Sequence, residues 1–183
     1  LEFRRVLFRS IKMNKIAFVF AGQGAQYTGM GKDFYDSFES SKNIFNLADV
    51  ALGFGLSDIC FNGTEEELAI TEITQPAILT VTTAIIEALK AKVRMPDMVA
   101  GLSLGEYSAH VCSGSINFQD AVKLVQKRGQ FMQGAVPIGV GTMAAIMGFT
   151  KEQTIEVCKE GSVFGIVEPS NFNCPGQTVI GGE

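Results

Sequence analysis

The chain has 183 residues, of which 46% are hydrophobic and 19% charged, and its formal net charge is −4. This composition is typical of a packed globular α/β protein, and the charge balance excludes the basic surface that nucleic-acid-binding proteins carry. Because the sequence has no apolar run of about eighteen residues, no membrane span is expected. Small molecules or other proteins are the expected partners, with neither nucleic acid nor membrane among them.

The four cysteines lie far apart, at Cys60, Cys112, Cys158 and Cys174. Their spacing fits neither a C-x-x-C motif nor a zinc site, so no metal site is predicted. Free thiols are usual in a reducing compartment, and a cytoplasmic location is therefore expected.

The first twelve residues, LEFRRVLFRSIK, contain three arginines and precede Met13. A basic, apolar leader could be a targeting segment, but this one lacks a long apolar core and a small-residue cleavage site. We interpret residues 1–12 as a non-native extension and Met13 as the natural start.

The next segment, KIAFVF, predicts a buried strand that leads into a glycine loop. Residues 31–52 then predict one helix. Thr64, with Glu67 three residues later, predicts a capping box. Residues 74–92 are apolar around most of a helix circumference and predict a long buried helix with Pro76 in its first turn.

The stretch DMVAG predicts a second strand, followed by a turn and a helix that ends near Cys112. Asn117 is the predicted cap of the next helix, with Asp120 in its first turn. We expect these elements to belong to an α/β-hydrolase-like large subdomain over residues 13–138.

The remaining segments predict a strand (TMAAIMGF), a capped helix (TKEQTIEVCKEG) and two strands (FGIVEPS and QTVIGG) joined by a polar turn. This β-α-β-β order opens a ferredoxin-like unit, whose second helix and fourth strand would follow Glu183. Residues 139–183 are therefore expected to form the first part of a small ferredoxin-like subdomain.

Ser103 lies between Gly101 and Gly105, where the second predicted strand meets its helix. A strand that turns sharply into a helix crowds its own backbone, so the positions two before and two after a nucleophile favour glycine. Such a turn would expose Ser103 at the helix end, with the amide of Leu104 as the natural oxyanion donor. G-x-S-x-G alone is a weak pattern, and a glycine-rich turn with a capping serine is the alternative.

Six motifs occur in order along the chain: FVFAGQGAQYTGMG, TQPAIL, GLSLGEYSA, QKRGQFMQ, VGTMAAI and NFNCPGQTVIGG. Together they resemble the malonyl-CoA:acyl carrier protein transacylase family, to which the acyltransferase domains of polyketide synthases are closely related. The resemblance implies transfer of a malonyl group from malonyl-CoA to the phosphopantetheine of acyl carrier protein in fatty-acid biosynthesis, with no cofactor bound by the enzyme.

The resemblance also implies roles for individual residues. Ser103 would attack the thioester and carry the acyl group as an ester, while the amides of Gln23 and Leu104 would bind the oxyanion. Arg128 would pair with the malonyl carboxylate through two parallel hydrogen bonds, and Met132 would line the same acyl pocket. From the residues alone, a flexible glycine turn, a solvated helix face and core packing are the alternatives for Gln23, Arg128 and Met132.

The sequence departs from the family pattern at two positions. Leu102 stands where histidine is common, which suggests altered packing near the turn. Cys174 stands where serine is common in the NFNSPGQ pattern, and we expect a passive small side chain there.

The expected general base is missing from this sequence. In the family it is a histidine in a later segment, whereas His110, the single histidine here, follows Ser103 by seven residues, or about 10 Å along a helix. We expect His110 to be a packed or partly exposed helix residue and the chain to be an incomplete gene, inactive or nearly so by itself. A serine thioesterase or hydrolase, and a carrier-binding fragment without turnover, remain the alternatives.

Overall fold

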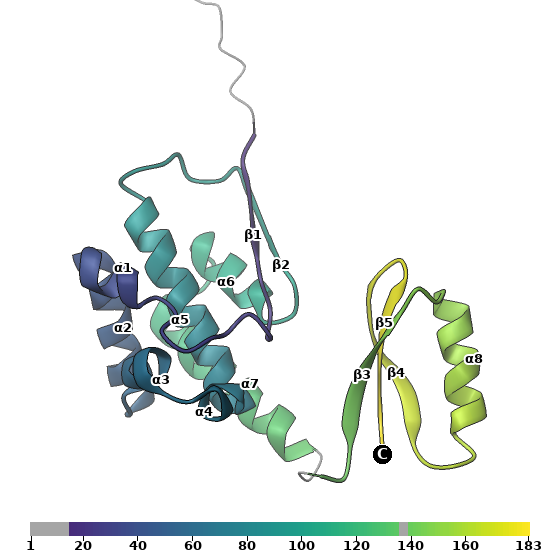
Figure 1. The fold of residues 1–183 in the computed structure, drawn as a ribbon. Helices are drawn as coiled ribbons and strands as arrows, with labels where there is room; N and C mark the ends of the chain where they lie inside the picture. Colours follow the sequence, from purple (N-terminus) through teal and green to yellow (C-terminus); the bar gives the residue numbers. More distant parts are fainter. Residues whose placement is uncertain (1–14, 136–138) are drawn as a thin grey trace, which may run out of the picture. The chain divides into compact units, whose positions relative to one another are not determined.

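The computed structural model describes residues 15–135 and 139–183, so the extension expected over residues 1–12 and the start at Met13 lie outside the described residues. The chain divides into two compact units, one ending at Gln130 and the other beginning at Phe131. Both combine helices and strands, which is the predicted α/β class (Figure 1). The subdomain limits expected at 13–138 and 139–183 stay a prediction.

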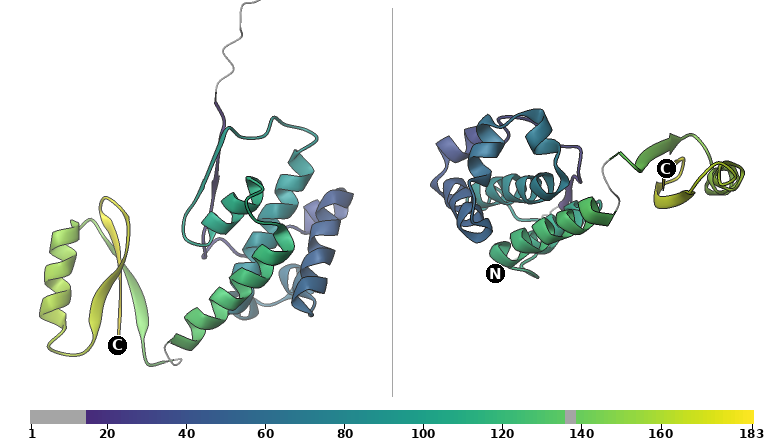
Figure 2. Two further views of the ribbon diagram at one scale, coloured as in Figure 1. Left: turned by 180° about the vertical axis from the view of Figure 1, so that it is seen from behind. Right: turned by 90° about the horizontal axis from the view of Figure 1, so that it is seen from below.

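The first unit contains a pair of short parallel strands, β1 (Ala17–Phe20) and β2 (Met98–Gly101). Ala17 pairs with Met98 and Phe20 with Gly101, so the two strands end at the same edge. Helix α6 (Gly105–Cys112) packs against both strands, and Figures 1 and 2 show the helices of this unit to one side of the pair. The carboxyl ends of parallel strands are a common place for binding sites in α/β folds.

Helix α5 (Thr71–Leu89) passes through the centre of the first unit, and most of its residues from Thr74 to Ala88 are buried. It packs against α1 (Lys32–Ser37), α2 (Glu39–Leu52), α3 (Leu56–Asn62), α4 (Glu65–Ala69) and α6. A helix buried on several sides was the prediction for this segment, and the structure confirms it.

Helix α5 begins earlier than the sequence predicted, and Pro76 lies inside the helix rather than in its first turn. The start is held by the carbonyl of Ile70, which accepts from the backbone N–H groups of Ile73 and Thr74 at 2.8 Å. The Thr74 hydroxyl donates to the nearby carbonyl of Leu68 and lies 3.1 Å from that of Ile70. These contacts support an extra turn before the proline, whose missing N–H removes one later helical bond.

The single helix predicted over residues 31–52 is wrong, because the chain breaks at Phe38. This residue is extended, with φ −132° and ψ 119°, and separates α1 from α2. The change of direction allows α2 to bury Ser41, Ile44, Phe45 and Ala48. Ser41 also donates a hydrogen bond of 2.8 Å to the carbonyl of Ala84 in α5. Tertiary packing therefore overrides continuous helical hydrogen bonding here.

The predicted helix caps are confirmed. Thr64 forms a full capping box with Glu67 at the start of α4. Asn117 accepts from the backbone N–H of Asp120 at 2.9 Å, at the start of α7 (Phe118–Ala135). These local hydrogen bonds satisfy N–H groups that a helix leaves unpaired at its first turn.

The second unit is a three-stranded antiparallel sheet with one helix. Strands β3 (Thr142–Met147), β4 (Val167–Cys174) and β5 (Gln177–Gly182) lie in the order β3-β5-β4, and α8 (Lys151–Gly161) packs on β4 and β5 (Figure 1). This is the arrangement predicted for the opening of a ferredoxin-like unit. Strand β4 extends through residues predicted as a polar turn, because only Pro175 and Gly176 are needed to reverse the chain.

None of the helices in the described part of the chain has both the length and the apolar character needed to span a bilayer.

Candidate active site

Ser103 occupies a strained turn between β2 and α6. Its φ is 53°, the only positive value among the described non-glycine residues, and such a backbone typically costs about 1–3 kcal/mol and is found at functional sites. A Cβ on Gly101 would lie 2.0 Å from the carbonyl carbon and oxygen of Gly105. The turn therefore requires glycine at position 101, as the G-x-S-x-G pattern indicated, and it leaves Ser103 exposed.

The loop that follows β1 lies against this turn. A Cβ on Gly22 would be 2.8 Å from the carbonyl oxygen of Leu102, and one on Gly105 would be 2.3 Å from that of Phe20. The N–H of Leu102 donates to the Phe20 carbonyl at 3.3 Å. Glycines thus allow the ends of both strands to approach closely, and this contact brings the Gln23 loop beside Ser103.

The backbone amides of Gln23 and Leu104 are the predicted oxyanion donors. Leu104 is fully buried and forms the N-cap of α6, directly after Ser103. Within the residues that the structure describes, neither amide donates a hydrogen bond to another backbone atom. Their role as oxyanion donors stays a prediction.

Arg128 reaches Ser103 from helix α7. One terminal nitrogen, Nη2, donates to the Ser103 Oγ at 3.0 Å, and the other, Nη1, donates to Oε1 of Gln75 at 2.8 Å. The guanidinium carbon lies 5.7 Å from the centre of the Tyr107 ring, within cation–π range. Arg128 is therefore not on a solvated face: residues from the turn, α5 and α6 surround it.

Two residues of this site were missed by the sequence analysis. Gln75 is fully buried in α5 and connects Arg128 to Gln23, whose Oε1 is 3.5 Å from the Gln75 Nε2. Gly129 is buried in α7, where a Cβ would lie 2.7 Å from the Thr71 carbonyl oxygen. A polar amide in an otherwise apolar helix, and a glycine inside a helical pattern, were the signals for these two positions.

Three other residues lie as follows. Met132 is one turn beyond Arg128 on α7, 46% exposed, and falls within the second compact unit, so its place in an acyl pocket stays a prediction. His110 is exposed, and its Nε2 lies 3.8 Å from the Glu106 carboxylate, one turn back on α6. Leu102 is 55% exposed beside the turn.

All four cysteines are free thiols. Cys60 is completely buried in the core of the first unit, and this burial, assisted by the charge of Asp49, raises its pKa to about 12. Such a thiol stays protonated and unreactive at neutral pH. Across the described residues, no group of three or more histidine, cysteine or acidic side chains is arranged to hold a metal ion.

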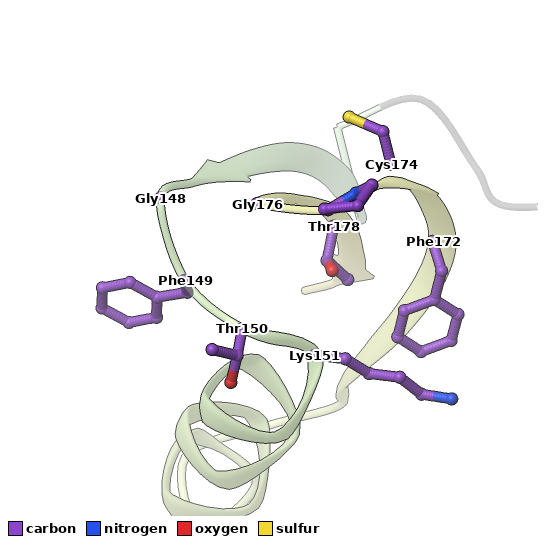
Figure 3. Close-up of a pocket in the computed structure, with 9 residues that line it drawn as sticks. Gly148, Phe149, Thr150, Lys151, Phe172, Cys174, Gly176 and Thr178 are labelled. Atoms are coloured by element: carbon purple, nitrogen blue, oxygen red, sulfur yellow. The ribbon is translucent and has the colours of Figure 1, made fainter.

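The second unit has a hollow of about 520 Å³ between the β3–α8 connection and the β4–β5 hairpin (Figure 3). Phe149 and Phe172 lie on either side of it, and the Lys151 ammonium lies 4.5 Å from the centre of the Phe172 ring. None of the residues predicted to bind substrate lines this hollow. Cys174, where the sequence departs from the family pattern, is exposed and lines this hollow.

Comparison with known proteins places this geometry in a family. The acyl transferase domain model matches residues 17–183. The malonyl CoA-acyl carrier protein transacylase of Bacillus subtilis is 48% identical over 174 residues, covering 93% of this chain and 54% of that protein. A Staphylococcus aureus protein of the same name is 45% identical over 171 residues, with 93% and 55% covered. The chain thus spans about half the length of the curated relatives it matches.

Solved structures agree with this assignment. The transacylase structure from Clostridium perfringens superposes with a TM-score of 0.83 at 53% identity, covering 93% of this chain and 54% of that one. A malonyl-transacylase solved in complex with a type II PKS acyl-carrier protein gives 0.85 at 45% identity, covering 93% and 55%. Since the family model covers nearly all described residues and the Ser103 turn lies within it, this chain belongs to the acyl transferase domain family.

Proposed function

We propose that this chain provides the nucleophile and the carboxylate clamp of a malonyl-CoA:acyl carrier protein transacylase. The observation that carries the proposal is the 3.0 Å contact between the guanidinium of Arg128 and the Oγ of Ser103. A malonyl thioester has a free carboxylate one methylene beyond its reactive carbonyl. An arginine beside the nucleophile can therefore bind this carboxylate while the carbonyl faces the serine, whereas an acetyl group offers it no charge partner.

The proposed reaction has two balanced half-reactions. Ser103 Oγ attacks the thioester carbonyl, the C–O bond forms, the C–S bond breaks, and the coenzyme A thiolate leaves with the proton that the serine hydroxyl loses. The phosphopantetheine thiol of the carrier protein then attacks the seryl ester, and the serine regains its proton. In each half-reaction the oxyanion would accept hydrogen bonds from the Gln23 and Leu104 amides. This chemistry requires no cofactor.

A base must remove the serine proton, and Arg128 cannot accept it because its guanidinium stays protonated. Among the described residues, Arg128 is the only side chain that hydrogen-bonds to the Ser103 Oγ. His110 instead lies beside Glu106. We assign the base to the part of the family's length that this chain does not span, where the resemblance implies a histidine. The 183-residue chain alone is expected to form the seryl ester slowly.

The carrier protein is the partner that this proposal requires. Support comes from the relative whose structure was solved with a type II PKS acyl-carrier protein. That complex also supports a polyketide-synthase role, in which the same residues would perform the same acyl transfer for a different pathway. The free thiols support a cytoplasmic location for the protein.

The test is mass spectrometry of the chain after incubation with malonyl-CoA, with peptide mapping of the modified residue. We expect a malonyl adduct on Ser103 that disappears in Ser103→Ala and is strongly reduced in Arg128→Ala. Lys123→Ala removes a positive charge from the exposed face of the same helix and serves as the matched control, with acylation unchanged.

The second arm joins the chain to the remaining length of a relative and supplies carrier protein. Malonyl-carrier protein as product supports the proposal, while free malonate would identify a hydrolase. Absence of a Ser103 adduct in both arms would contradict the proposed function.

A further inference from the structure

We propose that Gln75 is a positioning residue that orients Arg128 toward acyl groups bearing a carboxylate and connects this clamp to the Gln23 loop. This inference rests on the proposed function. It assigns the choice of substrate to a residue that need not touch the substrate itself.

Gln75 is a polar side chain in a buried stretch of α5, flanked by Thr74 and Pro76, and all three are buried. A buried amide is unfavourable unless its hydrogen bonds are made. Its Oε1 accepts from Arg128 Nη1 at 2.8 Å, and its Nε2 points to the Oε1 of Gln23 at 3.5 Å. The first contact is charge-assisted and the stronger of the two, so the guanidinium determines which way the amide faces.

The same contact determines how the guanidinium faces. Nη1 and Nη2 lie in one rigid plane, and Gln75 holds the first while Ser103 contacts the second. The Tyr107 ring, 5.7 Å from the guanidinium carbon, restricts motion out of that plane. Two in-plane hydrogen bonds and one ring thus hold the clamp before substrate arrives, which reduces the ordering that binding requires.

The network continues to the oxyanion loop. The Nε2 of Gln23 donates to the Thr71 hydroxyl at 3.4 Å, and Thr71 lies one turn before Gln75 on α5. Residues of α5 therefore contact both the nitrogen and the oxygen of the Gln23 side-chain amide. The contact of Gln23 with Thr71 does not involve Gln75, so replacing Gln75 is expected to disturb the carboxylate clamp more than the loop that carries the backbone amide of Gln23.

Glutamine suits this position because it is a neutral acceptor. Glutamate at position 75 would form an ion pair with Arg128 and cancel the charge that attracts a carboxylate. Methionine would keep the volume and leave Nη1 without an acceptor. In both cases α5 and its packing are retained, since both residues are good helix formers.

The test compares acylation of Ser103 by malonyl-CoA and acetyl-CoA in the 183-residue chain, followed by intact mass. In Gln75→Met and Gln75→Glu we expect the malonyl rate to fall about 10- to 100-fold, as for loss of a hydrogen bond to a charged group. Acetyl acylation should change by less than about threefold, because a neutral acyl group has no carboxylate to pair with the guanidinium. The malonyl-to-acetyl ratio is the readout, and a merely structural role would not move it.

Thr83→Val is the matched control. Thr83 is also buried in α5, but its hydroxyl donates within the helix to the Leu79 carbonyl at 2.8 Å. Thr83→Val should keep the wild-type malonyl-to-acetyl ratio even if it lowers the stability of the chain. An unchanged ratio in Gln75→Met, or equal losses with both thioesters, would overturn the assignment of Gln75 while leaving the proposed function intact. If no Ser103 adduct forms either in the wild-type 183-residue chain or in the chain joined to the remaining length of a relative, the proposed function is contradicted, and this inference with it.

Discussion

Replacement of Gly129 by alanine tests whether the close approach of α7 to α5 is what places Arg128. The added Cβ would lie 2.7 Å from both the Glu72 Cα and the Thr71 carbonyl oxygen. Because these are backbone atoms at the start of α5, no flexible side chain can move aside. Ordinary carbon contacts are about 3.5–4.0 Å, so α7 must move away from α5 by several tenths of an ångström or more.

Two effects on stability oppose each other. Alanine in a helix interior is more favourable than glycine by about 1 kcal/mol, whereas overpacking costs typically about 1–3 kcal/mol. We expect a net destabilisation of about 0–2 kcal/mol. The effect on acylation should be larger, because Arg128 is the adjacent residue and its hydrogen bonds to Gln75 and Ser103 measure 2.8 and 3.0 Å. A misplacement near 1 Å can reduce a rate by about 100-fold.

Urea unfolding followed by circular dichroism, together with mass spectrometry of Ser103 acylation, measures both quantities on one sample. Gly134→Ala is the matched control, because Gly134 lies near the end of the same helix and has no atom within 4 Å of its added Cβ. It should gain a few tenths of a kcal/mol up to about 1 kcal/mol and acylate normally. If Gly129→Ala is as stable and as active in Ser103 acylation as Gly134→Ala, the close approach of α7 to α5 does not position Arg128.

Three further variants test other features of the first unit. Gly101→Ala should abolish Ser103 acylation and lower stability by more than about 2 kcal/mol, because its Cβ would overlap the backbone 2.0 Å away; normal acylation would contradict the proposed turn. Ser108→Ala should raise the unfolding free energy by about 1–2 kcal/mol, because the buried hydroxyl has no hydrogen-bond partner in the described chain; a loss of stability in urea would show that it has one. For Cys60, whose pKa is raised from 9.0 to about 12, the unfolded chain ionises first as pH rises, so stability falls above pH 9 by up to about 1.4 kcal/mol per pH unit. Cys60→Ala should remove that part of the pH dependence, measured by urea unfolding between pH 8 and pH 10.

Local patterns were sufficient to predict most elements of this chain. Thr64 and Asn117 cap helices because their side chains bond to N–H groups only three residues away, and the two short apolar strands lead into glycine turns as expected. The errors arose where distant contacts outweigh local preference. The break at Phe38 and the early start of α5 depend on how α2 and α5 pack, and no short sequence window contains that information.

In the candidate site, too, one part follows from local sequence and another depends on contacts between distant residues. The need for glycine at position 101 is local, because its Cβ would meet the backbone of Gly105 four positions later, whereas glycine at 105 is required by the Phe20 carbonyl of the other strand. The contact between Ser103 and Arg128 joins residues separated by 25 positions, and that between Gln75 and Arg128 joins residues 53 apart. Only the family resemblance allowed the sequence to predict a role for Arg128 beside Ser103, and it predicted no role for Gln75.

The sequence by itself therefore determined the α/β class, the helix caps, the strained turn and the identity of the exposed hydroxyl, since each depends on atoms a few residues apart. The tertiary structure decided which charge faces that hydroxyl and what holds the charge in place. It did so because the parallel pairing of β1 with β2, and the close approach of α7 to α5 at Gly129, bring together side chains that are remote along the chain.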